Sequence, residues 1–167
     1  MKDVPTFGES LAPDTINRLE RAARQRYETG TLLSNQSRRL AALYFFGYAA
    51  EMCLATSYFR SWGFPPNAEI DRDLRVRHMK RARDLKLMSG DPHPIVGWAF
   101  LLQSQRILGG GLDDSDKIRL RMAIANAEII YRYWRPELRY KVVEVGEETL
   151  RKVQTAAKWL LDNQPLL

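Results

Sequence analysis

The sequence is poor in the residues on which most metal and redox sites depend. It contains two histidines, His78 and His93, and one cysteine, Cys53. These are too few ligands for a usual structural zinc site without carboxylates, and the HExxH and ExxH patterns are absent, so we expect no metal. A single cysteine cannot form an intrachain disulfide. Because Cys53 lies within an apolar stretch, we expect it to pack as a small hydrophobic side chain.

The sequence also lacks the common phosphate-binding and nucleophile motifs. GxxxxGK[ST], GxGxxG and GxSxG do not occur, and the glycines at 109–111 precede an expected helix without following a strand. We therefore predict no phosphate cradle at these glycines and no bound cofactor. The N-terminal ten residues lack the basic and then apolar segments of a signal peptide, which favours a cytoplasmic protein.

Long apolar runs are absent with one exception, at residues 40–59. In this stretch, LAALYFFGYAAEMCLATSYF, Glu51 is the only formally charged residue. A helix that is apolar nearly all round must be enclosed by other helices or by lipid. A carboxylate at the centre of a bilayer would cost on the order of several kcal/mol, and no second run of this length could shelter it. We therefore predict a buried central helix over about residues 40–61 and no membrane span.

Helical periodicity dominates the rest of the chain, and no segment indicates a paired strand. We predict an irregular arm over residues 1–12 and one all-α domain over residues 13–164, a helical bundle of five or six helices around the central one. Pro13 suits the first turn of the first helix, and Thr29-Gly30 is expected to end or bend it. The helix after the central one is expected to begin at an N-cap, Asn67, and to end at Ser89-Gly90.

The helix expected after Asp113 has the clearest amphipathic pattern. Asp113 is the expected N-cap. The apolar positions that we expect to face the core are Ile118, Met122, Ala125, Ile129 and Tyr133. Next to it, YRYWRPELRYK at residues 131–141 interleaves basic residues with aromatic rings. This mixture suits either single-stranded nucleic acid or a core corner, and we favour the core because Tyr133 and Trp134 continue the expected buried face.

Positive charge is concentrated in one segment. The net charge of the chain is +6. Residues 67–88 contain seven basic and four acidic residues, so this segment alone has a net charge of +3, half of the total. Such a local excess suits a phosphate-bearing partner. The candidates for nucleic-acid contacts are Arg75, Arg77, Lys80, Arg81 and Arg83. The alternative is that these residues form a solvated helix face that only keeps the protein soluble.

Glu51 and His78 are the candidate site residues with acid or base chemistry. A carboxylate in an apolar helix needs a cationic partner, and we expect a structural ion pair, for instance with Arg139; a functional acid in a helix-lined cavity is the alternative. Arg72 and His78 could together support phosphodiester cleavage, with the imidazole as acid or base and the guanidinium holding the anionic phosphorane. The alternative is a chance spacing in a helix rich in arginine.

Several features together resemble the HEPN superfamily of small all-helical proteins. They are GYAAE at residues 47–51, His93 followed by an apolar helix, the triplet Leu138-Arg139-Tyr140 and a final amphipathic helix. The resemblance implies an up-and-down bundle, frequently dimeric, in a superfamily that includes ribonuclease toxins and RNA- or nucleotide-binding modules. Its ribonuclease members have an arginine and a polar residue with four to six residues between the arginine and a histidine, and Arg72, Asp73 and His78 match that spacing.

We therefore expect a non-catalytic, homodimeric HEPN-like protein that binds RNA, a nucleotide or a partner protein such as an antitoxin, in a toxin–antitoxin or stress context. Two alternatives stay open. One is a metal-independent endoribonuclease toxin that uses Arg72 and His78. The other is a structural or interaction module with no nucleic-acid role.

Overall fold

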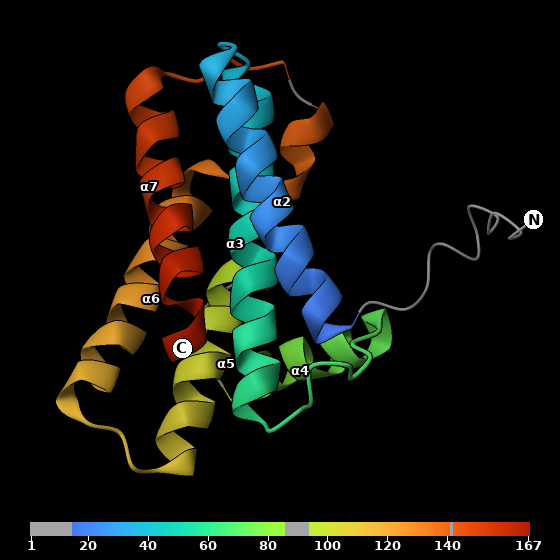
Figure 1. Cartoon of the computed structure of the whole chain (residues 1–167), viewed down its shortest axis with the longest axis vertical. Coiled ribbons are helices and arrows are strands. Elements are labelled where there is room, and N and C mark those ends of the chain that lie inside the picture. The colour runs from blue at the N-terminus through green and yellow to red at the C-terminus, as the bar shows by residue number, and fades with distance from the viewer. Residues whose placement is uncertain (1–14, 86–93, 141) are drawn as a thin grey trace, which may run out of the picture.

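The computed structural model describes residues 15–85, 94–140 and 142–167. These residues form an all-α helical bundle without strands, which confirms the predicted fold class (Figure 1). The predicted arm at residues 1–12 lies outside them. The α-helices are α2 (Ile16–Asn35), α3 (Arg39–Ser61), α4 (Arg72–Asp84), α5 (Pro94–Gly109), α6 (Asp114–Tyr133) and α7 (Glu147–Asn163), and two short 3₁₀-helices are η1 (Pro136–Tyr140) and η2 (Gln164–Leu166).

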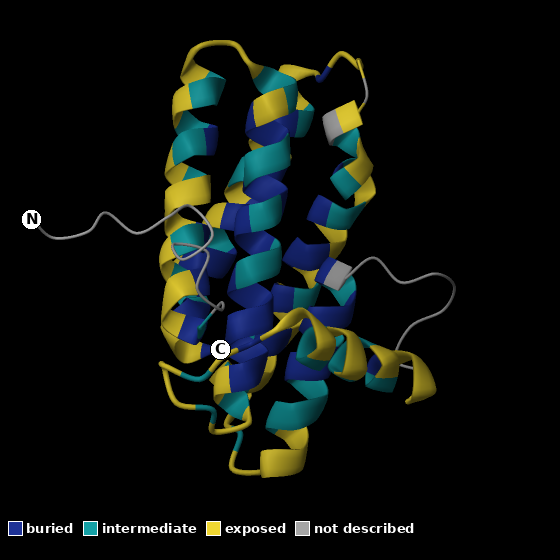
Figure 2. Cartoon of the chain, turned by 90° about the vertical axis from the view of Figure 1, so that its right-hand side faces the viewer, coloured by how far each residue is buried: buried dark blue, intermediate teal, exposed yellow. Residues whose placement is uncertain are grey.

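The central helix of the bundle is α3, as the apolar run predicted. It packs against α2, α5 and α7, and 13 of its 23 residues are buried (Figure 2). By length and composition alone α3 could cross a membrane, but 61% of its most apolar 18-residue window is buried inside the bundle. Its cysteine, Cys53, is fully buried, and burial raises the pKa of the thiol to about 12, so it packs without forming a reactive thiolate.

Two glycines allow aromatic rings to approach helix backbones. A Cβ added to Gly47 would lie 2.1 Å from a ring carbon of Trp134, and one added to Gly30 would lie 2.7 Å from a ring carbon of Phe46. Trp134 is fully buried, as expected from the core interpretation of its stretch. Of the two outcomes expected at Thr29-Gly30, an end or a bend, the end is wrong, because α2 continues to Asn35. Gly30 instead makes room for the ring of Phe46.

The start of α4 also differs from the prediction. Asp71, rather than Asn67, is the N-cap, and its carboxylate accepts a hydrogen bond from the Leu74 amide at 2.6 Å. The preceding segment instead satisfies the start of α2, where the amides of Ile16 and Asn17 donate to carbonyls of residues 68 and 66. Those carbonyls meet amides that have no partner within their own helix. The predicted end at Ser89-Gly90 lies outside the described residues.

The start of α6 agrees with the prediction, but its buried face does not. Asp113 caps the helix and accepts from the amide of Asp116 at 2.7 Å. The residues buried against α5 and α7 include Leu120, Ala123, Ala127 and Ile130. The expected core face is instead largely exposed, with exposed fractions of 53% for Ile118, 42% for Met122 and 40% for Ile129. The alanines of the buried face let neighbouring helices approach closely, which the larger residues opposite would prevent.

Candidate functional site

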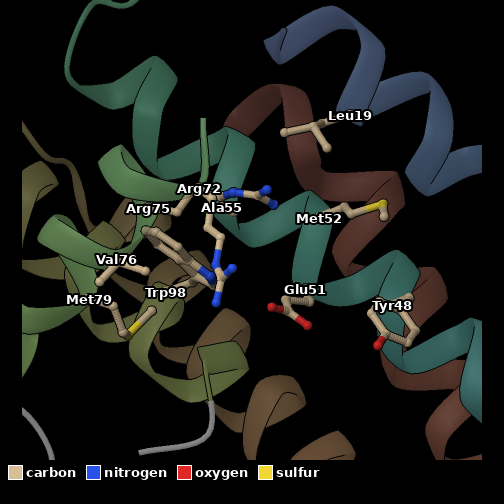
Figure 3. Close-up of a pocket in the computed structure, with 10 residues that line it drawn as sticks. All are labelled: Leu19, Tyr48, Glu51, Met52, Ala55, Arg72, Arg75, Val76, Met79 and Trp98. Carbon is tan, nitrogen blue, oxygen red and sulfur yellow. The ribbon is translucent and has the colours of Figure 1, made fainter. Parts of the chain in front are cut away.

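A mostly apolar cavity of about 260 Å³ lies beside the middle of α3, beneath α4 (Figure 3). The helix α4 runs across the bundle rather than along it (Figures 1 and 2), and four of its residues line the cavity. The residues that line the cavity are Leu19 from α2, Tyr48, Glu51, Met52 and Ala55 from α3, Arg72, Arg75, Val76 and Met79 from α4, and Trp98 from α5.

Helical spacing explains why these side chains meet. On α3 the lining residues recur at steps of three or four, from Tyr48 to Ala55, and on α4 they do so from Arg72 to Met79. Positions at this spacing share one face of a helix. Two complementary faces, each about two turns long, therefore enclose the cavity, and Trp98 contributes an aromatic wall from α5.

Among the described residues that line this cavity, Glu51 is the one acid. Glu51 is partly buried, and burial raises the pKa of its carboxyl to about 7, while the guanidinium of Arg75 opposes that rise. Figure 3 shows the side chains of Arg72 and Arg75 reaching from α4 into the space that Glu51 faces. The carboxyl group of Glu51 is therefore near the midpoint of its titration at pH 7. The side chain of Arg139, the partner suggested by the sequence, lies outside the described part of the chain.

His78 belongs to an aromatic cluster rather than to the cavity lining. Its Nδ1 lies 2.6 Å from the Tyr58 hydroxyl, and its ring packs edge-on against the rings of Tyr58, Phe59 and Trp62. Burial lowers the pKa of His78, and the charges of Arg81 and Arg77 lower it further. The neutral form of the ring is therefore favoured, and in this form Nδ1 can accept a hydrogen bond from the Tyr58 hydroxyl.

Arg72 and His78 do not line the same cavity. Six residues along a helix place their side chains about 120° apart around the axis. Arg72 lines the cavity, whereas His78 contacts the aromatic end of α3. The cleavage pair predicted from the sequence is therefore split between two faces of α4 within one chain.

The five basic candidates on α4 also divide into groups. Arg75 lines the cavity, and the guanidinium of Arg81 stacks 5.0 Å from the centre of the Trp62 ring. Arg77, Lys80 and Arg83 are exposed to solvent. The basic segment thus supplies one arginine to the cavity, one to an aromatic contact and three to the surface.

A second and more polar hollow, of about 410 Å³, contains three arginines: Arg24, Arg60 and Arg106. Its strongest contact is internal, because Arg60 pairs with Glu20 through two hydrogen bonds, one of them 2.7 Å long. The first cavity combines aromatic walls with an acid and two arginines, so it is the stronger candidate site. Among the described residues, no group of three or more His, Cys, Asp or Glu could hold a metal ion.

Sequence reasoning singled out Glu51, Arg72 and Arg75 but missed the aromatic walls, Tyr48 and Trp98. Tyr48 precedes Glu51 by three residues, and this spacing was a usable signal that the two share a face. Trp98 offered no such signal, because its place in the cavity depends on how α5 packs against α3.

Comparisons with protein-family models, curated proteins and solved structures find no match to this chain. The fold and the cavity define an all-α bundle with one mostly apolar pocket that holds a carboxyl group and two guanidinium groups. The resemblance to the HEPN superfamily rests on the sequence features alone.

Proposed function

We propose that this chain is a cytoplasmic, HEPN-like, non-catalytic protein that binds single-stranded RNA by holding one nucleotide at the cavity between α3 and α4. The observation that carries the proposal is the composition of this cavity: Tyr48 and Trp98 beside Glu51, Arg72 and Arg75. Aromatic rings stack on bases, and guanidinium groups bind phosphates with charge-assisted hydrogen bonds.

The size of the cavity indicates which part of a nucleotide would enter. Its volume of about 260 Å³ is below the range of roughly 300–1,000 Å³ that is usual for sites enclosing a drug-sized ligand. The base would therefore enter the cavity, and its phosphate would stay near Arg72, which is exposed. The carboxyl group of Glu51, near its midpoint at pH 7, accepts hydrogen bonds when ionised and donates one when protonated.

The surface of α4 favours a strand of RNA over a free nucleotide. Lys80 and Arg83 lie about two and three turns beyond Arg72 along the helix and are exposed. They are positioned to meet phosphates of neighbouring nucleotides, and single-stranded nucleic acid is bound by such a combination of basic groove and stacking rings.

The environment of His78 supports a non-catalytic role over the alternative of an endoribonuclease. Its pKa is lowered mainly by burial, its Nδ1 is engaged by Tyr58, and its ring is packed among aromatic side chains. A general acid or base must reach the substrate, and here one ring nitrogen is already occupied.

The test is binding of a fluorescent ten-nucleotide single-stranded RNA, followed by anisotropy at two salt concentrations. Arg72→Gln and Arg75→Gln should each weaken binding by roughly tenfold or more, since a hydrogen bond to a charged group contributes about 1.5–3 kcal/mol. Each should also reduce the salt slope by about 0.7, the value per phosphate for single strands. Arg151→Gln, an exposed arginine on α7, is the matched control and should change the affinity little.

The outcomes separate the candidate functions. Absence of RNA binding, or equal loss in all three variants, would contradict the proposal. If AMP, CMP, GMP and UMP bind as tightly as RNA, the ligand is a free nucleotide. If the RNA is cleaved and His78→Ala abolishes cleavage in a folded protein, the endoribonuclease alternative is correct.

A further inference from the structure

One apolar stripe on α6 has no covering element among the described residues. We call Ile118, Met122, Ala125, Ile129 and Tyr133 the α6 stripe. Ile118, Met122, Ala125 and Ile129 are exposed, and Tyr133 is partly buried. The stripe extends roughly 22 Å along a helix at one edge of the bundle (Figure 1). The opposite face of α6 is packed against α5 and α7.

The continuity of the stripe distinguishes it from ordinary exposed apolar residues. Single exposed residues such as Leu32 on α2 are normal on a protein surface. A row of apolar side chains at steps of four, three, four and four instead forms a seam of the kind that packs against another helix. Contiguous exposed apolar surface of this kind marks an interaction site.

We propose that the α6 stripe is the interface of a homodimer in which two copies of α6 pack antiparallel about a two-fold axis near Ala125. The stripe is nearly symmetrical about this residue. Antiparallel pairing sets Ile118 opposite Tyr133 of the second copy and Met122 opposite Ile129, and two alanines meet at the axis. A small residue at the crossing point permits close approach of the helices. This proposal is independent of the RNA-binding cavity.

Charge on the flank of the stripe identifies the occupant as a second copy in this orientation. Arg121 and Glu128 are exposed, lie on the same flank about two turns apart, and have no ion-pair partner in the described ranges. Around a two-fold axis near Ala125, Arg121 falls beside Glu128 of the second copy, and symmetry repeats this pair. Parallel pairing about a two-fold axis would instead place this flank of the two copies on opposite sides of the interface, where Arg121 would not meet Glu128.

The remaining charges of α6 are compatible with this arrangement. Asp114 pairs with Lys117 at 3.0 Å, and Asp116 pairs with Arg119 at 2.8 Å, so both pairs are satisfied within the chain. Arg132 would approach the Asp114–Lys117 pair of the second copy.

A single helix pair lies near the lower end of stable interfaces, which bury about 1,200 Å² or more, so we expect a dissociation constant in the micromolar range.

The first experiment measures the mass of the full chain by sedimentation between 1 and 100 µM, roughly the range set by that affinity. The unmodified protein should become a dimer within this range. Ile129→Glu should remain a monomer, whereas Leu32→Glu, a matched change at an isolated exposed residue, should dimerise normally. Circular dichroism confirms that each variant is folded. A monomer at every concentration, or loss of dimer in Leu32→Glu alone, would overturn the proposal.

The second experiment tests the antiparallel register. Arg121→Glu and Glu128→Arg should each weaken the dimer several-fold, and the double variant should restore it, because the pair is only reversed. Ala125→Cys should form a disulfide-linked dimer on mild oxidation, since the two copies meet at this residue. The control, Glu28→Cys on exposed α2 surface, should not, and buried Cys53 gives no background. Failure of the double variant to recover, or equal cross-linking at both positions, would overturn the register.

Discussion

Replacing Gly47 with alanine is the sharpest test of how the central helix is packed. A Cβ at this position would lie 2.1–2.2 Å from three ring atoms of Trp134. Carbon atoms in contact are separated by about 3.5–4.0 Å, so the indole ring would have to retreat by roughly 1.3 Å or more. Trp134 has no exposed surface into which it could move easily, and its Nε1 donates to the carbonyl of Tyr44 at 3.1 Å.

Three contributions set the size of the effect. Overpacking of a core costs typically about 1–3 kcal/mol. Loss of the indole hydrogen bond would leave a buried donor unsatisfied and cost about 1–3 kcal/mol more. Alanine is better than glycine inside a helix by about 0.5–1 kcal/mol, which offsets part of the loss. We therefore expect Gly47→Ala to lower the free energy of unfolding by roughly 2–4 kcal/mol and the Tm by about 5–15 °C.

Urea unfolding followed by circular dichroism measures this loss. Gly109→Ala is the matched control, because a Cβ added to Gly109 at the end of α5 meets nothing within 4 Å, and it should leave stability nearly unchanged. In a Trp134→Leu background the cost of Gly47→Ala should shrink, since the colliding ring is gone. If Gly47→Ala is as stable as the unmodified protein, the close packing of Trp134 on α3 is refuted.

Three further predictions concern titration and hydrogen bonds. Burial raises the pKa of Glu51 to about 7, so the free energy of unfolding should fall by about 3 kcal/mol as the pH rises from about 4.5 through 7. Urea unfolding at pH 5 and pH 8 measures this fall, and the Glu51→Gln variant should not show it. Tyr58→Phe removes the hydrogen bond to His78, which should cost about 1 kcal/mol and raise the pKa of His78 measured by NMR. Asp113→Ala removes the cap of α6 and should lower the Tm by an amount equivalent to about 1 kcal/mol.

Each of these predictions has a result that contradicts it. Identical pH dependence in Glu51→Gln and the unmodified protein would mean that the carboxyl group is well solvated. An unchanged pKa of His78 in Tyr58→Phe would mean that the hydroxyl does not contact Nδ1. An Asp113→Ala variant as stable as the unmodified protein would show that the capping hydrogen bond does not contribute to the stability of the fold.

The position of the central helix could be predicted from the sequence because composition alone decides it. Residues 40–59 carry only Glu51 as a formal charge, and a helix of that composition has to be enclosed. The Asp113 cap was equally readable, since capping is a local interaction between a carboxylate and an amide three residues away.

The buried face of α6 could not be predicted, because both of its faces carry apolar residues. Periodicity identified the row that begins at Ile118, but the row through Ala123 and Ala127 packs in the bundle. Which row is buried depends on how closely α5 and α7 approach, and this is a property of the assembled fold. The start of α4 was missed for a similar reason, since the segment around Asn67 is held by the distant start of α2.

The charged residues of the candidate site were predictable one by one, but their arrangement and the aromatic walls were not. Glu51 was conspicuous as an acid in an apolar run, and Arg72 and Arg75 belonged to the basic segment. Their meeting depends on the direction in which α4 crosses the bundle, and the aromatic wall from Trp98 depends on α5. Sequence spacing describes one helix at a time, whereas the cavity is built from four.

The most direct test of the cavity as a binding site is an NMR titration of the Glu51 carboxyl carbon, with and without a saturating single-stranded RNA. Without RNA the midpoint should lie at about pH 7. With RNA it should be displaced, because a base in the cavity changes both the solvation and the hydrogen bonding of this carboxyl group. A midpoint near pH 4.5 that RNA leaves unchanged would contradict the account.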